Sequence, residues 1–65
     1  MREKMLAALK LYAEGQIELH KMNVEVYLTN PAGIGEHPDV MESVQKELGQ
    51  IAEWEGQIFV LEKHF

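Results

Sequence analysis

Apolar residues recur at helical spacing over two long stretches of the chain, and a short segment rich in proline and glycine separates them. Apolar side chains return every three or four residues over 2–28 and again over 38–64, which is the period of an amphipathic helix. Residues 29–37 include Pro31, Gly33 and Gly35, which interrupt a helix and permit a turn. The pattern predicts one domain, residues 1–65, with an all-α fold: a two-helix antiparallel hairpin with helices at about 2–28 and 38–64 and a loop at about 29–37.

The first helix is apolar around most of its circumference. One apolar seam has heptad-like spacing, and a second runs beside it. The first seam consists of Met5, Ala8, Tyr12, Leu19, Met22 and Val26. The second seam consists of Leu6, Leu9, Ala13, Ile17, Val24 and Tyr27. A helix packed on a single partner needs an apolar stripe of only about 100°, so one neighbouring helix does not cover both seams. Gly15 lies on the first seam, where we expect it to let two helix backbones approach closely; a kink in the helix is the alternative.

The second helix carries one good seam, made of Val40, Val44, Ile51, Trp54, Ile58, Leu61 and Phe65. Glu47 interrupts this seam, and we expect it on a solvated flank or in a salt bridge to a lysine or Arg2. Antiparallel pairing places Met22 near Val44, Tyr12 near Trp54 and Leu9 near Ile58. This pairing predicts that the first seam faces the second helix and that the second seam remains uncovered.

Chain length supports a partner for the uncovered seam. A core of 65 residues contributes at most a few kcal/mol, and such chains usually need disulfides, a metal or a partner. The chain has no cysteine, and its three histidines lack a matching carboxylate pattern, so we expect no metal or other cofactor. We therefore expect a homodimer, two hairpins forming a four-helix bundle. The candidate interface is Leu6, Leu9, Ala13, Ile17, His20, Val24 and Tyr27.

His20 forms a polar patch with Gln16 and Asn23 at the edge of this candidate interface. Buried polar groups of this kind fix register in coiled coils. If His20 is half-buried, its protonation near pH 6 is expected to loosen the dimer.

No motif in the chain predicts catalysis. The glycines of residues 32–35 lack the preceding strand and third glycine of a dinucleotide site and the Gly-Lys-Ser/Thr of a Walker loop. No Glu-x-x-His occurs, as a di-metal bundle would need. Neither Glu47 nor Glu55 has an identifiable nucleophile or oxyanion donor nearby. We expect a protein that is not an enzyme.

Charge and hydropathy restrict the partners. The net charge of −5 with a single arginine argues against direct nucleic-acid binding, which depends on clustered basic residues. No apolar run reaches the roughly 18 residues of a membrane span. The lack of cysteine suits the cytoplasm, which is the expected location.

Ile34 is apolar in an otherwise polar loop, and two interpretations of it stay open. It either folds back to plug the end of the bundle or projects as a hook for a partner. Ile34, Glu36 and His37 are the candidate partner-binding loop.

A resemblance to known proteins extends over nearly the whole chain. It is carried by residues 22–28, Asn30-Pro31, residues 33–39, Glu47-Leu48 and residues 51–53. The chain resembles small uncharacterised helical-hairpin proteins of T-even-type tailed phages, many of which infect marine cyanobacteria. The resemblance implies a phage origin, a helical hairpin and a host-cell cytoplasmic location, and it brings no activity or site residues. A related resemblance, to the short helical-hairpin protein encoded beside the phage recombination helicase, implies an accessory role in DNA recombination.

These observations predict a small non-enzymatic accessory protein that acts as a homodimer by binding an unidentified protein. The alternative is an acidic nucleic-acid mimic that inhibits a DNA-binding enzyme. Its active face would be Glu14, Glu18 and Glu25, on a polar strip that Lys10 and Lys21 interrupt. On this strip we expect the i,i+4 pairs Lys10–Glu14 and Lys21–Glu25.

Overall fold

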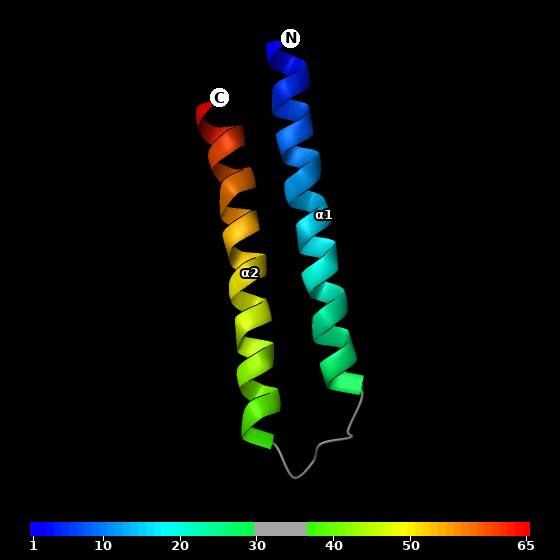
Figure 1. The fold of residues 1–65 in the computed structure, drawn as a ribbon. Coiled ribbons are helices and arrows are strands. Elements are labelled where there is room, and N and C mark those ends of the chain that lie inside the picture. The colour runs from blue at the N-terminus through cyan, green and yellow to red at the C-terminus, as the bar shows by residue number, and fades with distance from the viewer. Residues whose placement is uncertain (30–36) are drawn as a thin grey trace.

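The computed structural model describes residues 1–29 and 37–65, with side chains in the second range described from Asp39 onward. This part of the chain contains two helices, α1 (Arg2–Thr29) and α2 (His37–His64), and no strand. The helices lie side by side and antiparallel, so the two termini are at the same end of the molecule (Figure 1). The predicted helix bounds are confirmed to within one residue at each end.

Local interactions stabilise the helix ends. Asp39 lies in the first turn of α2 and Lys63 in its last turn, so the negative and positive charges stand at the ends where the helix dipole favours them. The hydroxyl of Thr29 at the end of α1 donates a hydrogen bond of 2.7 Å to the carbonyl oxygen of Glu25. A threonine in a helix can make this bond to the carbonyl four residues earlier.

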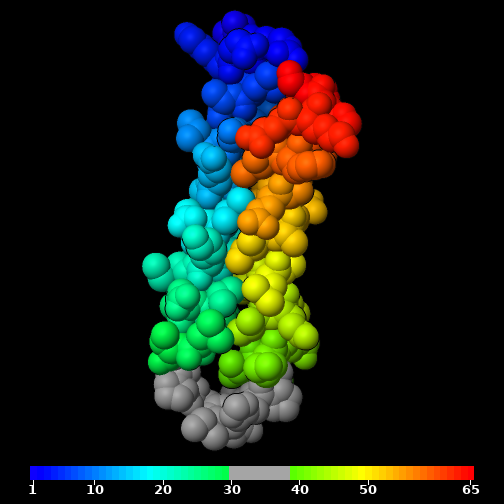
Figure 2. Space-filling view, turned by 180° about the vertical axis from the view of Figure 1, so that it is seen from behind, coloured from blue at the N-terminus to red at the C-terminus, as the bar shows by residue number. Residues whose placement is uncertain are grey.

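The helix pair is long and thin. Its principal extents are 52 × 15 × 10 Å and its radius of gyration is 15.2 Å, whereas a compact chain of this length would have about 11 Å. The side chains of α1 and α2 meet along most of the length of the pair (Figure 2). Two helices cannot enclose a thick core, and in the described part of the chain only Ala13, with an exposed fraction of 1%, is buried.

The second seam of α1, and not the first, faces α2. Ala13 is buried and Leu6, Ile17 and Val24 are half-buried against α2. The large residues of the first seam are between 52% and 62% exposed. The prediction that α2 covers the first seam and leaves the second uncovered is therefore wrong for the hairpin.

The register of the pairing is close to the predicted one. Tyr12 and Trp54 are neighbours, with ring centroids 5.4 Å apart and ring planes at 78° in an edge-to-face contact. At the open end, the guanidinium of Arg2 donates a hydrogen bond of 2.9 Å to the carbonyl oxygen of Phe65. Tyr12 reaches Trp54 from the flank of α1, so this pairing is compatible with either seam facing α2.

Glu47 supplies the physical reason for the rotation of α1. It lies in the middle of the α2 seam, where a carboxylate without hydrogen-bond donors would be costly. Turning the second seam toward α2 brings His20 and Asn23 to this carboxylate. The first seam would have presented Leu19 and Met22 there, and neither can donate a hydrogen bond.

Candidate functional site

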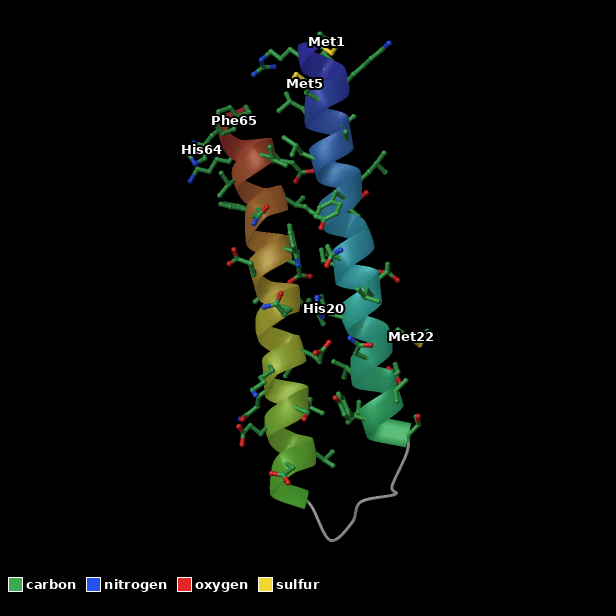
Figure 3. All side chains as sticks on the ribbon, in the orientation of Figure 1. Met1, Met5, His20, Met22, His64 and Phe65 are labelled. Carbon is green, nitrogen blue, oxygen red and sulfur yellow. The ribbon has the colours of Figure 1, made fainter. Side chains whose placement is uncertain are left out.

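A polar cluster lies in the middle of the contact between the helices. The Nδ1 of His20 donates to Oε1 of Glu47 at 2.7 Å, and the side-chain amide of Asn23 donates to the same oxygen at 2.7 Å. The side chains of His20 and Glu47 are only 16% and 19% exposed. His20 projects from α1 toward α2, whereas Met22 projects away from it (Figure 3). The sequence predicts that Glu47 lies on a solvated flank or pairs with a lysine or Arg2. Both predictions are wrong, because Glu47 is half-buried and its partners are His20 and Asn23.

This cluster fixes the register of the hairpin itself. The sequence offered a signal for it, because Glu47 interrupts an apolar seam and the donors on the apolar arc of α1 include His20 and Asn23. The contact lies within one chain, so the expectation that protonation of His20 loosens a dimer stays a prediction.

The hydrogen bond from His20, followed by that from Asn23, lowers the pKa of Glu47 below its ordinary value of 4.5. The folded chain therefore binds fewer protons than the unfolded chain in this acidic range, so the carboxylate stabilises the fold fully above pH 4.5. The contribution is lost as the pH falls through the lowered pKa.

We expect the substitution Glu47→Gln to lower the thermal unfolding midpoint at pH 7 by about 5 °C. The difference from the wild type should shrink as the pH falls below 4.5, since Glu47 is then protonated in the wild type as well. Thermal unfolding followed by circular dichroism between pH 3 and pH 7 measures both effects. Glu53→Gln, at an exposed position of α2, is the control. Equal changes for the two variants would contradict the role of Glu47.

The first seam of α1 is an exposed apolar face with an unbroken heptad repeat. Positions 5, 12, 19 and 26 repeat every seven residues, and positions 8, 15 and 22 lie between them. Gly15 completes this repeat. A Cβ added at Gly15 would meet no atom within 4 Å, so the close approach expected there does not occur with α2.

A groove with acidic walls runs along the opposite flank of the hairpin, and we call it the acidic groove. Its apolar lining includes Ile17, Ile51, Ile58, Leu48 and Phe59. Its carboxylates are Glu14, Glu18 and Glu25 from α1 and Glu55 and Glu62 from α2. The acidic strip predicted on α1 thus lies beside apolar side chains of α2, which the sequence did not reveal.

The lysines beside this groove pair differently from the prediction. Lys10 reaches across to Glu62 at 2.7 Å, and this contact raises the pKa of Lys10 above its ordinary value. Lys21 pairs with Glu18 at 3.2 Å, three residues away. The predicted pairs Lys10–Glu14 and Lys21–Glu25 are not formed. Across the described ranges, Glu14, Glu25 and Glu55 make no ion pair.

The candidate interface residues mostly lie inside the hairpin. Leu6, Ala13, Ile17, His20 and Val24 are buried or half-buried against α2, whereas Leu9 and Tyr27 are exposed on its edge. Since α2 already covers most of this set, it does not form a free face. Of the candidate partner-binding loop, Ile34 and Glu36, together with the side chain of His37, lie outside the described residues.

Two further findings concern metals and membranes. Within residues 1–29 and 39–65, no three histidine, aspartate or glutamate side chains come together as a metal site would require. Neither α1 nor α2 has a stretch of the length and hydropathy needed to cross a bilayer.

Comparison with known proteins found no family model, curated protein or solved structure that matches the chain.

Proposed function

We propose that this chain is a small non-enzymatic interaction protein that acts as a homodimer through protein–protein contacts. The observation that carries the proposal is the exposed first seam. It presents Met5, Tyr12, Leu19 and Val26 at intervals of seven residues on the outside of α1. Apolar residues at this spacing are typical of helices that pack on other helices in coiled coils and bundles.

The exposed surface of the single chain supports this proposal. The accessible surface is 5194 Å², whereas a folded monomer of 7.5 kDa would expose about 4,200 Å². The excess is comparable to the roughly 800 Å² that each partner buries in an interface of standard size. Closing the first seams of two copies against each other would bury surface of this order.

The sizes of the side chains favour an antiparallel arrangement of the two α1 helices. The seam alternates small residues, Ala8 and Gly15, with large ones. When the two helices run antiparallel, Gly15 of one copy faces Leu19 of the other, and Ala8 faces Val26. Small residues opposite large ones fill space without voids. A parallel pairing would place Gly15 opposite Gly15 and leave a gap. The result is a four-helix bundle with α2 of each copy on the outside of its own α1.

Light scattering coupled to size exclusion, repeated over a dilution series, tests the proposal. A mass of twice 7.5 kDa that persists at low micromolar concentration is the expected result. A helical monomer at every concentration up to about 100 μM would overturn the homodimer, since the association free energy would then be weaker than about 5.5 kcal/mol. The phage origin implied by the resemblance, and the accessory role in a phage process, remain predictions.

A further inference from the structure

We infer that the acidic groove is a docking site for a basic amphipathic helix of a partner protein. The inference rests on the proposed binding role of the chain, and its surface meets that of the proposed dimer only at Met22, which belongs to the first seam and also lines the groove. The groove lies on the flank formed by Glu14, Glu18 and Glu25 of α1 and by Leu48 and Phe59 of α2. The other residues of the first seam lie outside the lining of the groove.

The shape of the groove suits a third helix. The lining is continuous, because Glu18 belongs to both halves of it. From Glu14 to Glu25 it follows α1 for about 17 Å, or three helical turns. Its floor is the contact line between α1 and α2, and a helix laid along such a furrow packs on both neighbours at the usual distance of about 8–10 Å.

Apolar contacts would anchor the partner helix. Phe59 is 61% exposed and Leu48 is 51% exposed, and both stand on the α2 side of the groove. The half-buried residues Ile51 and Ile58 lie between them on the same helix. An amphipathic helix presents apolar residues three, four and seven positions apart, which matches this row of side chains.

The negative charge of the groove favours a partner helix with positive charge. Its lining holds five glutamates and one lysine, Lys21. In the described part of the chain, ion pairs satisfy Glu18 and Glu62 but not Glu14, Glu25 or Glu55. Lysines or arginines along one flank of the docked helix would lie opposite these three carboxylates. Charge complementarity of this kind steers association and excludes wrong partners.

The same charge excludes other occupants. A second copy related by a two-fold axis would bring the five carboxylates against their equivalents, which is repulsive. Nucleic acid and anionic membrane surfaces carry charge of the same sign as the groove. A basic helix is the class of ligand that satisfies both the apolar lining and the carboxylates.

A designed peptide serves as the probe. It is about 18 residues long, long enough to form a helix, and has leucines on one face and lysines on the other. A scrambled peptide of the same composition lacks the apolar face. Fluorescence polarisation of the labelled peptides against the full chain measures binding. We expect the amphipathic peptide to bind at least tenfold more tightly than the scrambled one.

Two sets of substitutions locate the site. The triple variant Glu14→Gln, Glu25→Gln, Glu55→Gln removes the unpaired carboxylates of the groove. The control triple Glu3→Gln, Glu42→Gln, Glu53→Gln removes the same charge from exposed positions outside its lining. We expect the triple variant of the groove to weaken binding of the amphipathic peptide at least tenfold. The control triple variant should weaken it less than twofold. Phe59→Gln, at an exposed position, should also weaken binding at least fivefold.

Three outcomes would overturn the inference. These are no binding of the amphipathic peptide, equal weakening by the two triple variants, and binding that is insensitive to Phe59→Gln and to scrambling. The last would indicate purely electrostatic capture of basic proteins, as by a nucleic-acid mimic. Light scattering on the same samples separates this test from that of the dimer, because peptide binding by a monomer would overturn only the homodimer.

Discussion

Replacing Leu19 with glutamate is expected to split the proposed homodimer and leave a helical monomer. Leu19 lies at the middle of the first seam and is 53% exposed in the single chain. Closing the seam would bury Leu19 of both copies. Removing one of these side chains costs the dimer about 2 kcal/mol of apolar burial. The symmetric dimer carries the substitution twice, so its dissociation constant should rise by about a thousandfold.

The matched control is Leu28→Glu. Leu28 is 65% exposed on the same helix, it lies off the first seam, and the substitution adds the same charge. Light scattering over a dilution series should find a monomer for Leu19→Glu and a dimer for Leu28→Glu. Circular dichroism should show similar helix content for both at high concentration. Dissociation by both variants, or by neither, would contradict the assignment of the interface to the first seam.

Removing the indole of Trp54 is expected to abolish folding of the hairpin. Trp54 is half-buried between the helices, where its ring meets the edge of Tyr12. Truncation of such a residue to alanine costs about 3 kcal/mol or more. A chain of this size has only a few kcal/mol of stability. We therefore expect Trp54→Ala to lose most of its helical circular dichroism at 25 °C.

Trp54→Phe separates packing from hydrogen bonding at the same position. The indole Nε1 is buried and has no hydrogen-bond partner in the described part of the chain. Phenylalanine keeps a ring against Tyr12 and removes this unpaired donor, whose burial costs about 1–3 kcal/mol. Its stability should match or exceed that of the wild type. Urea unfolding at one fixed protein concentration makes the comparison, since dimerisation would couple stability to concentration. A Phe variant as unstable as the Ala variant would show that the indole N–H is paired.

The polar cluster shows how far the sequence could identify the site. In the sequence, Glu47 interrupts an apolar seam, and His20 and Asn23 are polar groups on an apolar arc. Their mutual contact joins residues more than twenty positions apart, which no local pattern reports. The same holds for Lys10, whose local partner Glu14 was predicted and whose observed partner is Glu62.

The acidic groove and the first seam illustrate the same difference. The acidic strip of α1 followed from helical periodicity, but the exposed Phe59 and Leu48 beside it belong to the other helix. The spacing of the first seam predicts a packing face toward α2, whereas the rotation of α1 about its own axis in the fold leaves that face exposed.

The sequence by itself determined the two helices, their bounds, their antiparallel order and the neighbourhood of Tyr12 and Trp54. These features follow from local periodicity and from a breaker segment too short to allow any other connection. Only the tertiary structure decided which face of α1 meets α2. Both seams are apolar enough to pack, and turning α1 from one to the other changes the register little. The choice depended on Glu47, whose carboxylate has hydrogen-bond donors only when α1 presents His20 and Asn23.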